Sequence, residues 1–348
     1  MTSLTQSTQI VKNFAGVVLA SLVIIILIAV IFLNFSKSKN TPTIGTVIPS
    51  PPAIYQDPSQ KEPQVINLSQ TSTPAIPTEL PVYMAQTYNL TDKNYADLAL
   101  SFGINNPPFL IEEKTTEGKQ INWMQNKIYL TASQNSLRFE NQNQNKEELS
   151  LSEDQLKQKA FDFIQKIPVL DKDLTLRKTN YLSLQTRVYA SAASYNDAQV
   201  LEFIYDKKLS GYPLYNDSPD TSYVTLRITK GGNVTFLSTK LIQGFTKLNS
   251  YKLIAKDVAI KDIKNGQGKI VQTLIPDQNG QALEEFRARP QSLNLVDINS
   301  LTIAYFLPND ISEPIQPIFV AEGQSQNNQS EVGKVYIYLP ALESNNSK

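Results

Sequence analysis

The hydrophobic pattern of this chain is dominated by one long apolar run, residues 14–35. The run carries no charge, and only Ser21 and Asn34 within it are clearly polar. At about 1.5 Å per residue, a helix of this length spans roughly 33 Å, enough to cross the apolar core of a bilayer. The run is longer than the apolar region of a signal peptide, and no small-residue cleavage pattern follows it. It therefore predicts an uncleaved, single-pass membrane anchor behind a short tail, residues 1–13.

The charges beside this run do not set its orientation. Lys12 and the α-amine precede it, and Lys37 and Lys39 follow it. Because the positive charges on the two sides balance, the positive-inside rule gives no preference. The composition and the spacer that follows favour a cytoplasmic N-terminus and an extracytoplasmic C-terminal region. We therefore expect a protein of the cell membrane that faces the cell envelope.

Proline dominates the next stretch, residues 36–82, which holds nine of the 20 prolines. Proline removes backbone donors and favours extended polyproline-type conformations. Ser, Thr and Gln lie between the prolines, with isolated Ile and Val. This composition predicts a disordered tether between the anchor and a folded region.

Three segments beyond the tether have helical patterns. Residues 91–102 place apolar side chains on one side, with Gly103 as a stop. A capping box from Ser152 to Gln155 opens a second helix, which Pro168 ends. Its predicted buried face is formed by Leu156, Ala160, Phe163 and Ile167. A shorter apolar stripe predicts a third helix at residues 255–264.

Alternating apolar and polar positions predict strands between and after these helices. Residues 121–133 and 137–141 suggest a hairpin. Residues 224–236 form a clear hairpin pattern, with Lys230 to Asn233 as the turn. Further strands are expected at residues 174–176, 182–188, 200–205, 300–307, 317–321 and 334–339.

The order of these elements predicts an α+β fold made of helix-plus-antiparallel-sheet units. An N-terminal α+β subdomain at residues 83–149 would hold the first helix and hairpin. Two related α+β units would follow at residues 150–249 and 250–342, and residues 343–348 would be a disordered tail. The relation between the two units is one of pattern rather than of residue identity.

Composition narrows the possible functions. The 32 basic and 32 acidic residues cancel, so no basic stripe suggests a nucleic-acid partner. The chain has no cysteine and no histidine. This excludes disulfides, thiolate or imidazole metal ligands, Ser-His-Asp triads and a phospho-accepting histidine. We assign no catalytic residue, metal or cofactor, and expect a protein that is not an enzyme.

Aromatic residues supply the candidate interaction surface, at Tyr212, Tyr215 and Trp123. Exposed aromatic side chains suit protein or glycan surfaces. The alternative for all three is packing within the fold, which is common for aromatics on strands. Asp217 and Asp220 would suit calcium, or would be ordinary turn residues beside Pro219. Glu284, Glu285, Arg287 and Arg289 indicate a solvated face.

Two parts of the chain carry motifs with a family resemblance. The first part contains two motifs, GYPLY beginning at Gly211 and VTLRITKGGNVTFLSTKL beginning at Val224. The second is the closing series of strands that begin at Ser300, Ile315 and Val335. Together these residues resemble the YycH/YycI family, which is related to PepSY-type domains. The resemblance covers roughly residues 150–342, and its motifs identify no reactive group.

This resemblance implies a membrane-anchored regulator with an extracytoplasmic α+β region. Family members bind a membrane sensor histidine kinase of a two-component system and damp its activity. The expected partners are therefore the lipid bilayer and such a kinase or another envelope protein. Two alternatives remain open: a structural module that binds cell wall or glycan, and a membrane-tethered hydrolase that uses carboxylates. The hydrolase would need two carboxyl groups about 5–10 Å apart in a cleft.

Overall fold

The structure is a computed structural model of the chain. It describes residues 49–54, 63, 65–72, 74–88, 92–105, 110–115, 118–133, 135–143, 150–185, 188–217, 219, 223–274, 293–327 and 332–343. The predicted anchor at residues 14–35 and the short tail before it lie outside these residues. Within them, the structure has no helix with the length and apolar character needed to cross a membrane.

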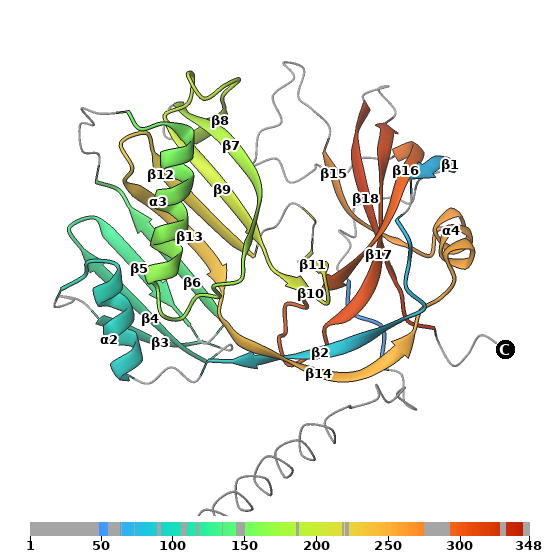
Figure 1. Cartoon of the computed structure of the whole chain (residues 1–348), viewed down its shortest axis with the longest axis horizontal. Helices are drawn as coiled ribbons and strands as arrows, with labels where there is room; N and C mark the ends of the chain where they lie inside the picture. The colour runs from blue at the N-terminus through green and yellow to red at the C-terminus, as the bar shows by residue number, and fades with distance from the viewer. Residues whose placement is uncertain are drawn as a thin grey trace, which may run out of the picture. The chain divides into compact units, whose positions relative to one another are not determined.

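The described residues are predominantly strands (Figure 1). Their three helices are α2 (Asp92–Ser101), α3 (Glu153–Lys166) and α4 (Lys256–Lys264). The first strands along the chain are β1 (Val65–Ser72), β2 (Glu79–Thr87), β3 (Leu110–Thr115), β4 (Gly118–Gln125), β5 (Ile128–Ala132) and β6 (Ser136–Asn141). The middle strands are β7 (Thr175–Gln185), β8 (Val188–Ser191), β9 (Val200–Asp206), β10 (Lys208–Leu209), β11 (Tyr212–Tyr215), β12 (Val224–Thr229) and β13 (Val234–Lys240). The last are β14 (Ile242–Lys252), β15 (Lys269–Leu274), β16 (Leu293–Phe306), β17 (Gln316–Asn327) and β18 (Val332–Pro340).

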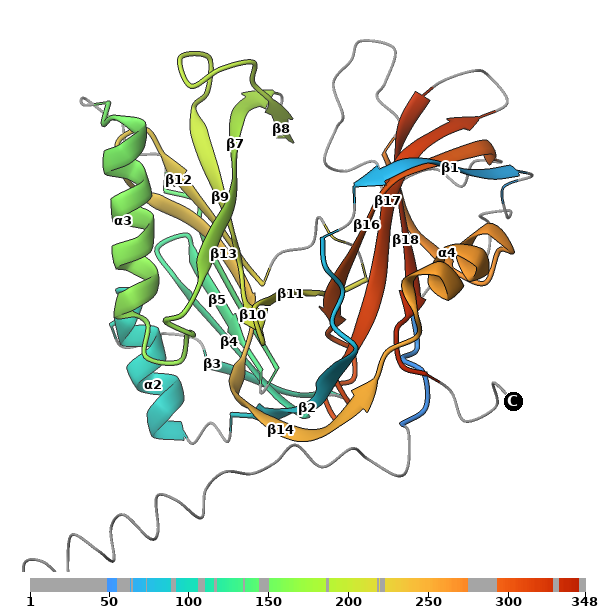
Figure 2. The same cartoon turned by 45° about the vertical axis from the view of Figure 1, so that its right-hand side comes forward.

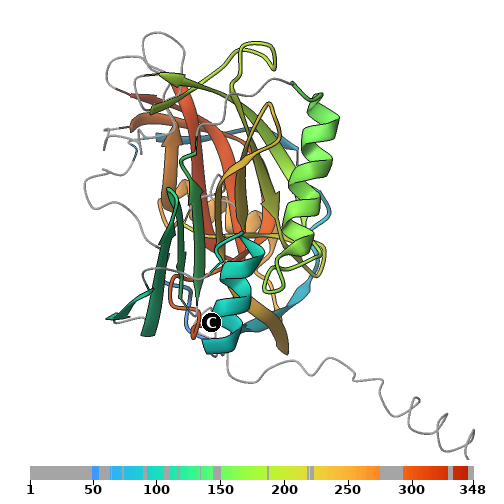
Figure 3. The same ribbon diagram turned by 90° about the vertical axis from the view of Figure 1, so that its left-hand side faces the viewer.

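The first large sheet has nine strands in the order β3-β4-β5-β6-β13-β12-β9-β7-β8. Helices α2 and α3 cover one of its faces (Figure 3). The capping box predicted at Ser152 begins α3, whose buried residues Leu156, Ala160 and Ile164 join the sheet's core. Apolar strand residues such as Phe203 and Leu226 complete that core. Among the described residues, no helix packs against the opposite face of this sheet (Figure 3).

The second large sheet has seven strands, with β10-β11-β16-β17-β18-β15 as its main order. The long strand β16 also pairs in parallel with β1, so strands from both ends of the chain meet here (Figure 2). Helix α4 packs on one face through Ala259 and Ile263. On the other face, Phe306 and Tyr338 belong to a separate apolar cluster.

A ribbon and a hairpin join the two sheets. Strands β2 and β14 form a two-stranded ribbon that runs between them (Figure 1). Strand β9 continues through Lys207 into the β10–β11 hairpin, and β11 then pairs in parallel with β16. The turn of this hairpin uses Ser210 and Gly211, both with positive φ. The ribbon is tied to the seven-stranded sheet by Tyr305 of β16, whose hydroxyl donates to the buried carbonyl of Pro81 in β2 at 2.9 Å.

The predicted fold class is wrong, because the fold is β-rich and not a series of helix-plus-sheet units. Strand β6 pairs with β13, and β12 pairs with β9, so one sheet draws on both sides of the boundary expected near residue 150. The hydrophobic pattern indicated individual strands correctly in many places. It did not indicate which strands would pair, because pairing joins residues distant in sequence.

The predicted tether is also wrong where the structure describes it. Strand β1 lies within residues 36–82 and pairs with β16. Earlier still, Pro52 is buried, Ile54 packs against the Phe306 cluster, and the buried Gln316 donates from Nε2 to the Ser50 carbonyl at 2.6 Å. The prolines lie around β1 and not inside it, so the high average proline content concealed a short strand.

Candidate protein-binding groove

A shallow groove lies on the helix-covered face of the nine-stranded sheet, between α3 and β7. Its cavity volume is about 400 Å³. Polar side chains of α3 form one rim, and apolar side chains form the floor. The lining residues are Asp154, Lys157, Gln158, Phe161, Leu174, Thr175, Leu176 and Tyr205. We call this feature the α3–β7 groove.

Phe161 gives the groove its apolar character. Its side chain is 39% exposed and lies beside the apolar floor. Tyr205 lies in the floor, and burial raises the pKa of its phenol to about 12. Leu174 and Leu176 are half-buried and pack against the main core. The groove therefore offers apolar area that the chain's own helices leave uncovered.

The first turn of α3 is held to the sheet beside this groove. Lys157 pairs with Glu153 at 2.8 Å, one helical turn apart. The Tyr181 hydroxyl of β7 donates to Glu153 at 2.8 Å. These hydrogen bonds from Lys157 and Tyr181 lower the pKa of the Glu153 carboxyl. The rim of the groove is thus linked to β7 through a carboxylate that remains ionised at neutral pH.

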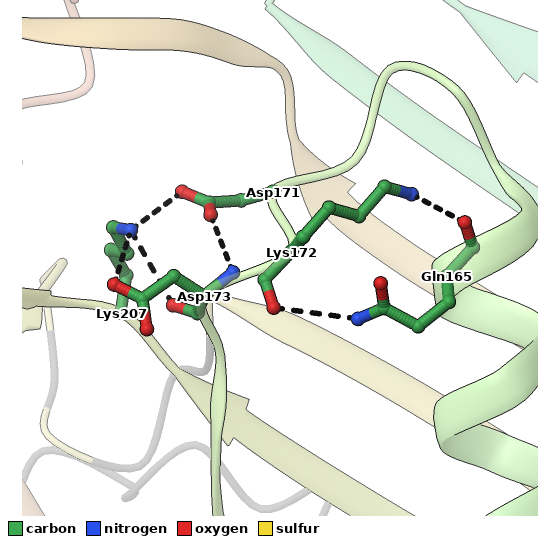
Figure 4. A network of polar contacts seen from close by, with 5 residues as sticks. All are labelled: Gln165, Asp171, Lys172, Asp173 and Lys207. Atoms are coloured by element: carbon green, nitrogen blue, oxygen red, sulfur yellow. Dashed lines mark hydrogen bonds and ion pairs between the residues drawn. The ribbon is translucent and has the colours of Figure 1, made fainter.

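A network of polar contacts holds the loop that leads from α3 to β7 (Figure 4). Lys172 Nζ donates to the final carbonyls of α3, at 3.0 Å from Ile164, 2.8 Å from Gln165 and 2.5 Å from Ile167. A cation at the carbonyl end of a helix is favourable because the helix dipole is negative there. Burial lowers the pKa of the Lys172 ammonium. The cap fixes the direction in which the chain leaves α3.

A second lysine fixes the other half of this loop. Lys207, which follows β9, pairs with Asp171 at 3.0 Å and with Asp173 at 3.2 Å (Figure 4). The Lys207 side chain is only 11% exposed, so water screens its pair with Asp171 less than it would a surface pair. Leu174 comes directly after this network. The two lysines therefore position the apolar residue that begins the groove floor.

A buried acid lies behind the groove, on the opposite face of the sheet. Asp206 of β9 pairs with Arg177 of β7, with 3.4 Å between Oδ2 and Nε. The register between β7 and β9 shifts between Leu176 and Lys178, so Arg177 occupies a β-bulge. Bulges re-aim side chains. Here Arg177 also donates to the Pro219 carbonyl and lies 6.0 Å from the centre of the Tyr215 ring.

The helix-free face of the nine-stranded sheet carries a second buried acid. Glu202 accepts from Arg227 Nε at 2.7 Å and from Asn180 Nδ2 at 2.9 Å. The Arg227 guanidinium lies 5.0 Å from the centre of the Phe236 ring and 5.1 Å from that of Tyr189. These aromatic rings therefore already contact a cation of their own chain. They offer less open ring surface to a sugar than isolated surface aromatics would.

The three aromatic residues predicted as an interaction surface lie within the fold. Trp123 is only 3% exposed and packs against Tyr95 at 5.9 Å, so it belongs to the core beneath α2. Tyr212 is half-buried and contacts both main apolar clusters. Tyr215 is half-buried beside Arg177 and the Phe306 cluster. The structure does not bring Trp123 together with the two tyrosines on one surface.

The predicted calcium pair is only partly described. Asp217 accepts two hydrogen bonds from Asn309 Nδ2, at 3.3 and 3.0 Å, while Asp220 lies outside the described residues. The Glu284 to Arg289 charge cluster also lies outside them. Within the described ranges, no three Asp, Glu, His or Cys side chains form a metal-binding group.

Sequence reasoning did not find the α3–β7 groove. One signal was available, since Phe161 lies in a capped amphipathic helix but outside its predicted buried stripe. A phenylalanine on the polar side of a surface helix suggests a contact beyond the helix's own core. The remaining floor residues come from β7, the residue before it and β9, and their approach to Phe161 depends on the tertiary fold.

Comparisons with known proteins provide a fold likeness only. No protein-family model matches the chain, and no curated protein matches it. One similar solved structure is described as the "Crystal structure of an uncharacterized protein from Eubacterium rectale ATCC 33656 at 1.45 A resolution". It shares 11% sequence identity and a TM-score of 0.50 with this chain, over 80% of this chain and 89% of that one. A likeness at this identity extends to the fold and not to function.

Proposed function

We propose that this chain is a non-enzymatic, membrane-anchored protein that binds an amphipathic helix of a partner protein in the α3–β7 groove. The observation that supports it best is the groove itself, an apolar floor with a charged rim beside an exposed phenylalanine. Grooves of this composition bind helices that present one apolar face.

The geometry of the groove favours a short helix as its occupant. Its α3 residues Asp154, Lys157, Gln158 and Phe161 are spaced over two helical turns, about 10 Å of axis. A partner helix lying beside α3 would extend the helical layer over the half-buried side chains of Leu174 and Leu176, with the buried Tyr205 beneath them. Two turns of such a helix supply apolar residues at i, i+3 or i+4, and i+7, which match the groove's length.

The cellular setting follows from the sequence. Residues 14–35 would anchor the chain in the cell membrane, with the N-terminus cytoplasmic and the folded region extracytoplasmic. A protein held in this way meets partners in the same membrane at high effective concentration. The resemblance to the YycH/YycI family supports a sensor kinase as that partner, which would make this chain a regulator of envelope signalling.

Site-specific cross-linking tests the groove. A photoreactive phenylalanine analogue replaces Phe161 in the full-length chain, which is then made and irradiated in living cells. The matched control places the same analogue at Val258 of α4, a side chain of similar exposure on another helix. We expect an adduct at position 161 whose partner peptide is amphipathic and helical. Equal adducts at both positions, or none at position 161, would contradict the groove.

A second arm tests the anchor. The same cross-linking chain is prepared without residues 14–35. Loss of the adduct, together with release of the chain from the membrane fraction, is expected if the partner is a membrane protein. An undiminished adduct to a partner that is not in the membrane would contradict the membrane setting and leave the groove intact. The binding groove and the membrane setting can therefore be disproved independently of each other.

A further inference from the structure

The chain passes from the nine-stranded sheet to the seven-stranded sheet directly after a buried acid. Asp206 ends β9 and is only 6% exposed. Lys207 follows, and then the β10–β11 hairpin, whose second strand pairs with β16. Any change in the charge of Asp206 therefore acts at the point where the two sheets join. We call Asp206, Arg177, Tyr215 and the Pro219 carbonyl the junction.

Asp206 is incompletely stabilised as an anion. Its partner Arg177 Nε is 3.4 Å away, longer than the 2.7–2.9 Å typical of a charge-assisted hydrogen bond. Its other oxygen, Oδ1, is buried and has no hydrogen-bond partner among the residues that the structure describes. A buried carboxylate needs donors on both oxygens to offset the loss of water. The neutral acid has a smaller requirement, so the closed junction favours protonation.

The charged and titratable groups around Asp206 come from several strands. Arg177 of β7 and Lys208 of β10 favour the anion, whereas burial disfavours it more strongly and raises the pKa of Asp206 to about 6. Tyr215 of β11 faces the same acid. Burial first, and then Asp206, raise the pKa of its phenol, and Glu322 of β17 adds a smaller effect in the same direction.

We propose that the junction is a pH-responsive clamp, which tightens the connection between the two sheets when the surroundings become acidic. Protonation of Asp206 removes a poorly hydrated charge from the closed junction. At neutral pH the ionised carboxylate favours an opened junction, in which the β10–β11 hairpin moves away and water reaches Asp206. The clamp is independent of what occupies the α3–β7 groove.

The direction and size of the effect follow from linkage. The closed junction binds the proton with a pKa of about 6, against 3.8 for an exposed aspartate. Closure is therefore favoured as the pH falls through 6, and the gain is complete below about 4. For these two values, the opening equilibrium constant falls roughly tenfold between pH 7 and pH 5.

Hydrogen exchange of the full-length chain in detergent tests the clamp. Amides of β10 and β11 report opening of the junction, and those of β12, at the centre of the nine-stranded sheet, report global unfolding. After correction for intrinsic exchange, we expect protection of β10 and β11 to rise about tenfold from pH 7 to pH 5. Asp206→Asn, which is neutral at both values, should show high protection at both.

Asp217→Asn is the matched control, since it removes an acid just beyond the same hairpin, and it should retain the wild-type pH dependence. Equal protection of wild-type β10 and β11 at the two pH values would overturn the proposal. So would a tenfold change that persists in Asp206→Asn, or one that appears equally in β12, because that would reflect global stability.

Discussion

Two tyrosine hydroxyls link three distant segments of this molecule. Tyr305 of β16 donates to the Pro81 carbonyl of β2, and its ring meets that of Tyr83 edge-on with 5.4 Å between centres. The Tyr83 hydroxyl in turn forms a 2.7 Å hydrogen bond with Ser210 in the β10–β11 turn. Burial raises the pKa of Tyr305, so its hydroxyl remains a donor throughout the physiological range.

We expect Tyr305→Phe to lower the free energy of unfolding by about 1–3 kcal/mol, because it leaves the buried Pro81 carbonyl without its donor. Urea denaturation followed by tyrosine and tryptophan fluorescence measures the change. Tyr251→Phe is the control, since that ring is also buried, at 7% exposure, on the β2–β14 ribbon. Equal losses in the two variants would show that the Tyr305 hydroxyl has no special role.

The two buried acids show that a sequence can reveal an unusual residue without revealing its partner. Glu202 and Asp206 are spaced four apart in the otherwise apolar strand β9, and so lie on the same face. Acids inside an apolar strand are a recognisable signal of burial or function. Their partners Arg227 and Arg177 lie on other strands, at separations that no local pattern defines. The sequence therefore indicated unusual acids but not the arginines that neutralise them.

At the scale of elements, local signals were reliable. Helices α2, α3 and α4 were predicted from caps and apolar stripes, and each is confirmed within a residue or two. The β12–β13 hairpin is also confirmed, with Gly232 at a positive φ in its turn. In α3, Leu156, Ala160 and Ile167 are buried as predicted, but Ile164 is buried more deeply than Phe163.

The sequence predicted one hairpin where the structure has two turns in succession. Strands β4 and β5 are joined by Asn126 and Lys127, whose φ values are +49° and +62°. Two positive φ values in a two-residue loop define a type I′ turn, for which Asn-Gly is the preferred sequence. The sequence did not predict this turn, because its second position holds lysine in place of the usual glycine. A side chain at a positive φ is strained.

Lys127→Gly should therefore stabilise the protein, raising the free energy of unfolding by about 0.5–1 kcal/mol. Relief of backbone strain in the turn exceeds the added entropy of glycine in the unfolded chain. Thermal and urea unfolding provide the measurement. Lys269→Gly, in the extended strand β15, serves as the matched control and should destabilise the protein instead. A loss of stability in both variants would contradict the turn geometry.

At the scale of the whole molecule, residues 49–54 lie across the helix-free face of the seven-stranded sheet. Pro52 is buried, Ile54 packs against the apolar cluster that contains Phe306 and Tyr338, and Gln316 donates to the Ser50 carbonyl. We call these six residues the strap. In a membrane-anchored chain, the strap would be the first part of the folded region after the anchor, so it would bear any pull from the membrane.

Ile54→Asp should release the strap, because it places a charge against the apolar cluster of Phe306 and Tyr338. Limited proteolysis with mass spectrometry should show cleavage within residues 49–54 at least several-fold faster than in the wild type. Ala53→Asp adds the same charge one residue earlier, at an exposed position, and should change cleavage little. Similar acceleration in both variants would mean that the strap is not held by Ile54.

Because the seven-stranded sheet pairs an early strand with a late one, it cannot be completed until most of the chain has been synthesised. Strand β1 and the strap leave the ribosome well before their partners β16 and Gln316, the latter 266 residues after Ser50. At about 5–20 residues per second, roughly 10–50 seconds pass before those partners are made. During that interval the β1 edge is open to pairing with other chains. We therefore expect nascent chains to need chaperones until the final strands are made. A high local concentration of nascent chains should favour aggregation over completion of the seven-stranded sheet.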